Sequence, residues 1–242
     1  MQSQPAVQPN FDIYFLSEQA VTVAFGPEIS EARLQQITAF DRLISQNPFP
    51  GFRCSVPAYH TISVFYDPLK VSKSDFPGVD SFAKVSWYLQ KLKLEPENIV
   101  VKEASTITIP VCYGNGFGPD LEELAKSHQL SMEAIIHLHS AAVYKVYMIG
   151  FVPGFAYLGG MNEVLDTPRK AVPRQKIPAG SVGIAGKQTG IYPMETPGGW
   201  QIIGRTPLQL FAADRPQPAL LKAGDNVVFK PVSVNEFKLI SY

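Results

Sequence analysis

The most informative stretch of the chain is GFVPGFAYLGGMNEVLDTPRKAVPRQKIPAGSVGIAGKQTGIYPMETPGGWQIIGRTP, which runs from Gly150 to Pro207. It holds eleven of the chain's 18 glycines and seven of its 21 prolines. Short apolar runs lie between these residues, and no helical periodicity is found from Tyr144 to Tyr242. Short strands separated by turn-forming residues are typical of closed or stacked antiparallel sheets. The stretch therefore predicts a β-barrel or a β-sandwich for the C-terminal part of the chain.

The same stretch is poor in charge, because only Lys187 and Glu195 are charged between Ile177 and Gly204. Glycine lets a ligand approach backbone N–H groups closely, and proline keeps the loops that carry them stiff. We therefore expect a ligand-binding surface here. A second interpretation stays open, in which the tight corners of a barrel simply need glycine and proline.

The flanks of this stretch predict more regular elements. A strand is expected at Thr106–Cys112, where apolar and polar residues alternate, and two short helices follow it. Asp120 with Glu123 has the spacing of a capping box for the first helix, and Ser131 can cap the second. A late strand is expected at Val227–Val232.

The first hundred residues have a different pattern. From Ala20 onwards it predicts the order β-α-β-β-α-β, the split arrangement of ferredoxin-like domains. The predicted elements are strands at Ile13–Ser17, Ala20–Phe25, Gly51–Val56, His60–Tyr66 (after a turn at Pro57) and Ile99–Val101, a helix capped by Ser30 and stopped at Asn47-Pro48, and a second helix with Phe82, Val85, Leu89 and Leu92 on one stripe. We therefore expect an α+β protein with a ferredoxin-like α/β domain at residues 1–103 and a β-domain at residues 104–242.

Composition narrows the classes of partner. Lys and Arg number 21, as do Asp and Glu, so the formal net charge is zero and nucleic acid is not an expected ligand. No apolar run is as long as a membrane span, and the first residues lack the pattern of a signal peptide. Cys54 and Cys112 have no metal-binding or redox spacing. These features favour a cytoplasmic protein without a tightly bound metal.

Three runs of the sequence resemble one protein family. They are VCYGNGFGPDLEEL (Val111–Leu124), VYMIGFVPGFAYLGG (Val146–Gly160) and TPRKAVPRQKIPAGSVGIAGKQTGIYPMETPGGWQIIGRTPLQLF (Thr167–Phe211). The family contains the B component of bacterial ATP-dependent 5-oxoprolinase, the sporulation kinase A inhibitor and allophanate hydrolase subunit 1. The resemblance covers the chain after residue 105 and implies that the β-domain is a cyclophilin-like barrel. The chain departs from it at Asn115-Gly116, where relatives often carry Gly-Glu.

The resemblance implies a non-autonomous subunit of an enzyme that opens 5-oxo-L-proline to L-glutamate while it hydrolyses ATP. The implied partners are a C-type subunit, similar to allophanate hydrolase subunit 2, and an A-type subunit. Two alternatives stay open, an inhibitor of a sensor histidine kinase and a subunit for allophanate or urea degradation. A phosphate-binding loop at Ser181–Gln188 is not supported, because Ser replaces its first Gly and Gln replaces the Ser or Thr that would hold magnesium.

Six residues are candidates for the site. We expect His139 and Arg205 to be catalytic, and Arg174, Gln188, Thr189 and Tyr192 to bind the substrate. A histidine on the inward stripe of a helix can act as an acid or base near neutral pH, and a guanidinium can hold a carboxylate or phosphate through two hydrogen bonds. The alternatives are a core histidine satisfied by a backbone carbonyl, structural arginines that pair with loop carbonyls, and turn residues.

Overall fold

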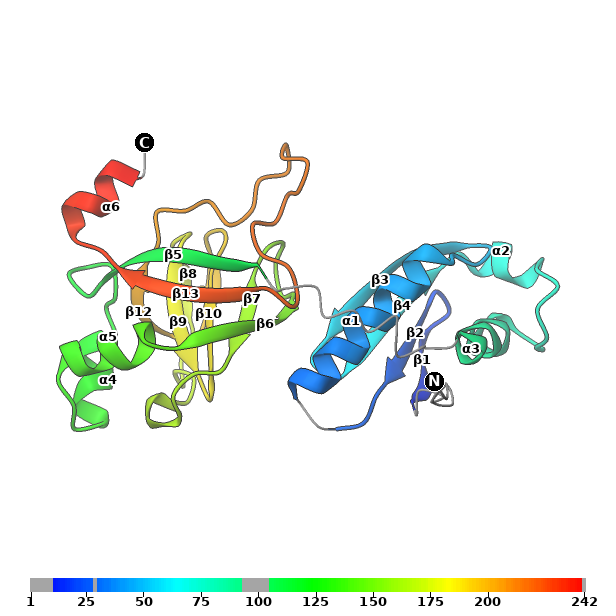
Figure 1. Ribbon diagram of the computed structural model, residues 1–242, viewed down its shortest axis with the longest axis horizontal. Coiled ribbons are helices and arrows are strands. Elements are labelled where there is room, and N and C mark those ends of the chain that lie inside the picture. Colours follow the sequence, from blue (N-terminus) through cyan, green and yellow to red (C-terminus); the bar gives the residue numbers. More distant parts are fainter. Residues whose placement is uncertain (1–10, 28–29, 93–104, 241–242) are drawn as a thin grey trace, which may run out of the picture. The chain divides into compact units, whose positions relative to one another are not determined.

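The structure is a computed structural model that describes residues 11–27, 30–92 and 105–240 (Figure 1). The chain divides into two compact units, residues 1–103 and residues 104–242. Together they make an α+β protein, with an α/β sheet in the first unit and a closed barrel in the second. None of the described helices is long and apolar enough to cross a membrane.

The first unit is a four-stranded antiparallel sheet with helices packed against it. Its strands lie in the order β1-β2-β4-β3. The elements are β1 (Asp12–Ser17), β2 (Ala20–Ala24), α1 (Glu31–Gln46), β3 (Phe52–Ala58), β4 (Thr61–Tyr66), α2 (Pro68–Ser72) and α3 (Ser81–Lys91). The predicted strands and helices from Ile13 to Leu92 are therefore present, with α2 as an addition.

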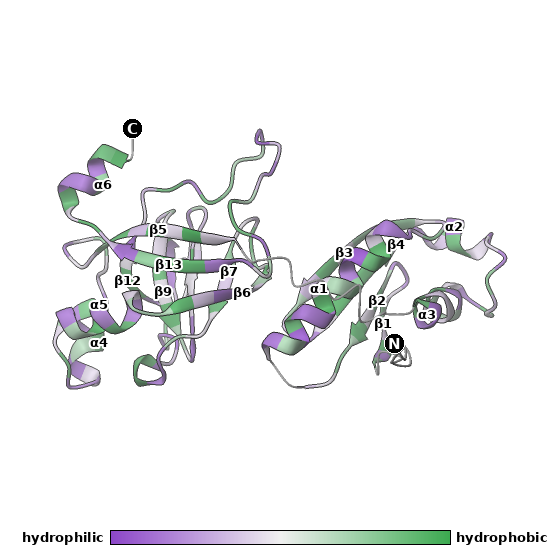
Figure 2. Cartoon of the chain, in the orientation of Figure 1, coloured by the Kyte–Doolittle hydropathy of each residue, from purple (hydrophilic) through white to green (hydrophobic). Residues whose placement is uncertain are grey.

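Helix α1 forms where its sequence pattern predicts. The Ser30 side chain accepts a hydrogen bond from the Arg33 N–H at 3.2 Å, which satisfies one of the free donors of the first turn. Leu34, Ile37 and Phe40 are buried, and Ile37 and Phe40 belong to the core that α1 shares with the sheet. Figure 2 shows α1 with hydrophobic and hydrophilic residues interleaved along its length, so the burial of one face stabilises the helix.

One detail of this unit differs from the prediction. Pro57 lies inside β3 rather than in a turn, which is tolerated because β3 is an edge strand and a proline there breaks no ladder on its open side. In the sheet, β2 lies between β1 and β4. The predicted closing strand Ile99–Val101 lies outside the described residues.

The second unit is built around a closed seven-stranded barrel with the order β10-β7-β6-β13-β5-β12-β9. Strands β13 and β5 are parallel, and the other neighbours are antiparallel. The barrel strands are β5 (Thr106–Tyr113), β6 (Val143–Ile149), β7 (Ala156–Gly159), β9 (Ser181–Ala185), β10 (Gln188–Ile191), β12 (Gln201–Arg205) and β13 (Asn226–Pro231). Outside it lie α4 (Leu121–Ser127), α5 (Met132–Ser140), the 3-10 turn η2 (Glu163–Leu165), the paired strands β8 (Arg174–Ile177) and β11 (Thr196–Gly198), and α6 (Val234–Ile240).

The expectation that no helix follows Tyr144 is wrong. Helix α6 begins after Ser233, whose hydroxyl accepts from the Glu236 N–H at 3.2 Å while the Glu236 carboxylate accepts from the Ser233 N–H at 2.7 Å. This is a capping box, and its Ser-x-x-Glu spacing stands in the sequence. The helix is only seven residues long, too short for apolar periodicity to reveal it, and Phe237 fixes it by packing on Phe117 with ring centroids 4.6 Å apart.

Candidate functional site

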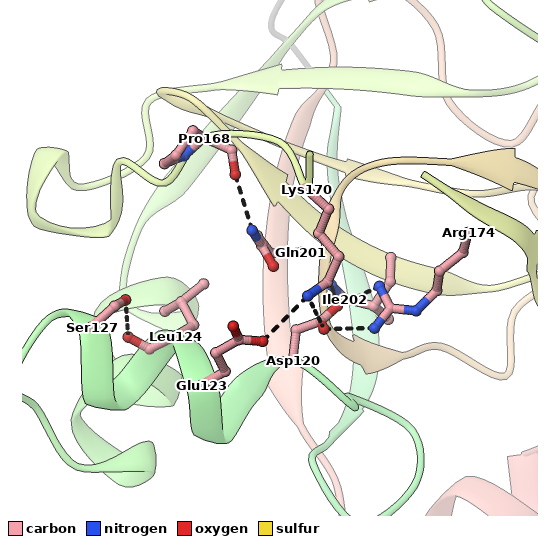
Figure 3. A network of polar contacts seen from close by, with 9 residues as sticks. All are labelled: Asp120, Glu123, Leu124, Ser127, Pro168, Lys170, Arg174, Gln201 and Ile202. Atoms are coloured by element: carbon pink, nitrogen blue, oxygen red, sulfur yellow. Dashed lines mark hydrogen bonds and ion pairs between the residues drawn. The ribbon is translucent and has the colours of Figure 1, made fainter. Parts of the chain in front are cut away.

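A buried carboxylate, Asp120, is the centre of a polar network in the barrel unit (Figure 3). Asp120 precedes α4 and is 2% exposed. Its backbone N–H donates to the Ile202 carbonyl at 2.9 Å, and the Ile202 N–H donates to Asp120 Oδ2 at 2.7 Å. A Cβ on Gly118 would lie 1.9 Å from the Ile203 carbonyl oxygen, so only glycine lets this loop approach β12 so closely.

Two cations converge on this carboxylate. Arg174 donates from Nη1 to Oδ2 at 2.8 Å and from Nη2 to Oδ1 at 2.6 Å, and Lys170 Nζ lies 2.9 Å from Oδ1 (Figure 3). Burial raises the pKa of Asp120, but hydrogen bonds from Arg174, Lys170 and the Ile202 N–H outweigh it. The pKa of Asp120 therefore lies below its ordinary value of 3.8, and the carboxylate is ionised at neutral pH.

The Asp120 network corrects the predicted capping box, because the Asp120 side chain makes no cap hydrogen bond to α4. A capping carboxylate would face the helix, whereas this one faces Arg174 and Lys170. Lys170 also reaches Glu123, at 3.3 Å, so two cations meet two carboxylates. In this network two positive charges offset two negative ones, and its contacts join β8 and the loop before it to α4 and β12. Arg174 uses both terminal nitrogens on Asp120, which favours a structural role for this candidate.

His139 lies in the barrel core with 0% exposure and stacks on Phe229, ring centroids 4.5 Å apart. Its Nδ1 is 2.8 Å from the Tyr113 hydroxyl and its Nε2 is 2.9 Å from Thr189 Oγ1. Because the single hydroxyl hydrogen of Thr189 is donated to the Gly183 carbonyl, at 2.9 Å, Nε2 must carry the proton and Nδ1 must accept one from Tyr113.

This arrangement defines one neutral tautomer of His139 with both ring nitrogens satisfied. Desolvation by burial lowers the pKa of His139 from its ordinary 6.5 to about 3. A neutral, enclosed imidazole offers no surface to a substrate. The geometry therefore favours the interpretation of His139 as a core histidine, held by two hydroxyl groups rather than by a backbone carbonyl.

The other candidates lie in different places. Thr189 is enclosed with His139, and Gln188 precedes it at the half-buried start of β10. Tyr192 is 1% exposed, and burial raises its pKa to about 12 while a hydrogen bond with the Trp200 backbone opposes the shift. Arg205 ends β12, where its Nε donates to the Ala179 carbonyl at 2.7 Å. The structure thus joins His139 with Thr189 and brings the charge of Arg174 near Tyr192, whereas Arg205 is bonded to the Ala179 carbonyl.

Several glycines of the Gly150–Pro207 stretch make room for side chains. Val182 and Ile184 face the barrel core, so Gly183 between them faces outward, where an aromatic cluster of Phe155, Tyr157, Tyr192 and Trp200 covers the wall. A Cβ on Gly190 would lie 2.9 Å from both Phe155 Cζ and Trp200 Cζ3. At Gly183 and Gly190 the second interpretation of the glycine-rich stretch therefore applies. The barrel needs glycine there for packing and not for binding a ligand.

Replacing Gly190 with alanine is expected to lower the free energy of unfolding by about 1–3 kcal/mol, because two rings must move to admit one methyl group. Gly199→Ala is the matched control, since the nearest atom to its Cβ would lie at 3.5 Å, an ordinary contact. Urea unfolding of both variants measures the difference. Equal stabilities would show that the rings over Gly190 are loosely packed.

Sequence reasoning missed Asp120 and Lys170 as members of one network. Both stand in the family-like runs, and Gly118-Pro119 before Asp120 was the available signal of a close backbone approach. Gly116, where relatives often carry an acid, has φ +82° and open space around its Cβ. Among residues 11–27, 30–92 and 105–240, no three His, Cys, Asp or Glu side chains gather to hold a metal ion.

The chain is similar in sequence to a known domain family and to several known proteins. Residues 11–221 match the model of the carboxyltransferase domain, subdomains C and D. The chain is 46% identical to the 5-oxoprolinase B component of Bacillus subtilis over 94% of this chain and 95% of that protein. It is 39% identical to the 5-oxoprolinase B component of Escherichia coli O157:H7 over 90% of this chain and 94% of that one.

Among solved structures, the crystal structure of TTHA0988 superposes with a TM-score of 0.75 at 34% identity and covers 89% of this chain. The chain spans 40% of the length of that protein. The same unit therefore occurs in that relative as part of a longer polypeptide.

Proposed function

We propose that this chain is the B component of an ATP-dependent 5-oxoprolinase. The chain belongs to the family of 5-oxoprolinase B components, whose fold is the carboxyltransferase domain, subdomains C and D. The observation that carries the proposal is the 46% identity to the Bacillus subtilis protein over nearly the full length of both chains. The enzyme opens the lactam of 5-oxo-L-proline to L-glutamate and hydrolyses ATP. ATP is a co-substrate here.

The chemistry explains why ATP would be needed. A five-membered lactam is a poor electrophile, and phosphorylation of its carbonyl oxygen turns that oxygen into a leaving group. The general acid or base predicted from this chain, His139, is enclosed in the core. These points support an active site that is shared with an A-type and a C-type subunit, and a chain that is inactive alone.

The expected result of reconstitution follows from this division of labour. A mixture of this chain with the A-type and C-type subunits, 5-oxo-L-proline and ATP should release glutamate and ADP together. Omission of any one protein should stop glutamate formation. Glutamate formation that continues at the same rate without this chain would reject the proposal.

The finer architecture is part of the same proposal. The four-stranded sheet with its helices supports a ferredoxin-like domain at residues 1–103, and the closed barrel supports a cyclophilin-like domain at residues 104–242. Cys54 and Cys112 are free thiols, one exposed and one buried. Reduced cysteines suit a cytoplasmic enzyme.

A further inference from the structure

Arg205 is a partly buried cation whose terminal nitrogens have no acceptor among the described residues. The guanidinium makes one hydrogen bond, from Nε to the Ala179 carbonyl at 2.7 Å. No described carboxylate forms an ion pair with it. Charges that are taken out of water are usually paired, so this side chain keeps donors that suit an anion.

The side chain is held in place by a rigid turn. Gly180 follows Ala179, and its N–H donates to the Tyr192 carbonyl at 2.7 Å while its own carbonyl accepts from the Thr206 N–H at 2.9 Å. A Cβ on Gly180 would lie 2.3 Å from the Thr206 carbonyl oxygen, and its φ is +82°. The Ala179 carbonyl, which orients Arg205, therefore belongs to a turn that packs tightly against Thr206, the residue after Arg205. Such pre-ordering reduces the entropy lost when a ligand binds.

Two other arginines of the barrel unit show what a satisfied guanidinium looks like. Arg174 binds Asp120 with both terminal nitrogens. Arg215 binds the Gln209 carbonyl and the Gln209 side chain, each at 2.9 Å. In Arg205 the one hydrogen bond is made by Nε, so the end-on pair, Nη1 and Nη2, has no bonded partner among the described residues. This pair matches the two oxygens of a carboxylate.

We propose that Arg205 binds the carboxylate of 5-oxo-L-proline through Nη1 and Nη2, an inference that rests on the proposed function. The substrate has one carboxylate and a lactam, so this contact distinguishes it from neutral lactams and fixes the ring. A guanidinium has five N–H donors and no acceptor, which suits Arg205 to binding the substrate and not to acting as a base. The role assigned from sequence is sharpened accordingly.

The test compares two substrates in the reconstituted three-subunit enzyme. The acid, 5-oxo-L-proline, and its carboxamide differ only at the group that Arg205 would hold, and ATP turnover is followed as ADP release. Wild type is expected to favour the acid by about 100-fold in kcat/KM. Arg205→Gln should lose most of this preference by raising the KM for the acid, and Arg205→Lys should keep part of it. The KM for ATP should stay unchanged.

Arg215→Gln provides the matched control, because it removes the same charge from the same unit at a guanidinium that is already satisfied. Co-elution of each variant with the A-type and C-type subunits shows that the complex is intact. If wild type is active and Arg205→Gln retains the preference for the acid, the inference about Arg205 fails and the proposed function stands. If the wild-type mixture makes no glutamate, the proposed function fails and the inference falls with it.

Discussion

Replacing Asp120 with alanine is expected to lower the free energy of unfolding of the barrel unit by about 3–5 kcal/mol. The change removes a carboxylate that is 2% exposed and leaves Arg174 and Lys170 without their shared counter-charge. It also leaves the buried Ile202 N–H without its acceptor. Urea unfolding in a Trp87→Phe background measures the effect, because Trp200 alone then reports on the barrel.

Glu122→Ala is the control for Asp120→Ala. Glu122 stands two residues away and pairs with Lys126 at 2.7 Å, but both side chains are well exposed at 69% and 75%. Exposed pairs of this kind contribute little to stability, because solvent screens the two charges. An Asp120→Ala loss as small as that of Glu122→Ala would show that the network in Figure 3 does not hold the barrel unit together.

The Asp120 network also has a defined dependence on pH. The pKa of Asp120 in the folded protein lies below the ordinary 3.8. As the pH falls, this carboxylate therefore takes up a proton in the unfolded chain before it does so in the folded protein. The stability that the carboxylate contributes is fully present above about pH 4 and is lost as the pH falls through its folded pKa. Wild type and Asp120→Asn should therefore converge in stability under strongly acidic conditions and differ most at neutral pH.

Replacing His139 with alanine is expected to lower the free energy of unfolding by about 3–5 kcal/mol. The change leaves a cavity beside Phe229 and deprives the Tyr113 hydroxyl of its partner. His137→Ala is the control on the same helix, since His137 is exposed, and its cost should stay below about 0.5 kcal/mol. Similar losses in the two variants would contradict the description of His139 as a structural residue.

The titration of His139 separates its structural role from a catalytic one. The pKa falls from 6.5 in the unfolded chain to about 3 in the folded protein, so the unfolded chain takes up the proton first as the pH drops. Stability is full above pH 6.5 and declines towards pH 3, by about 5 kcal/mol in all at 1.36 kcal/mol per pKa unit. His139→Gln should remove this decline and still support turnover in the reconstituted enzyme.

Local pattern predicts much of this fold because local forces decide it. Ser30 caps α1 and Ser131 caps α5 through bonds within one turn, and the alternation in β5 directs Ile109 and Val111 into the core. These contacts depend on neighbours in the sequence, or on which face of an element is apolar. A β-domain, either a barrel or a sandwich, was predictable for the same reason, since glycine and proline punctuate its short strands.

The site was harder to predict because its partners are far apart in the sequence. Asp120 and Arg174 are separated by 54 residues, and His139 and Thr189 by 50. A charged residue before a helix looks the same whether it caps the helix or pairs across the barrel. A glycine that admits an aromatic ring, such as Gly190, looks the same in sequence as one that admits a ligand. The roles of Asp120 and Gly190 become clear only in the folded barrel, where residues far apart in the sequence come into contact.

In the proposed enzyme this chain is a stoichiometric part of a shared active site. Titrating it into fixed amounts of the A-type and C-type subunits, with saturating 5-oxo-L-proline and ATP, tests that claim most directly. The rate of glutamate formation is expected to rise from zero in proportion to the amount of this chain and to reach a plateau at a fixed molar ratio. A rate that is independent of the chain, or that stays at zero throughout the titration, would contradict it.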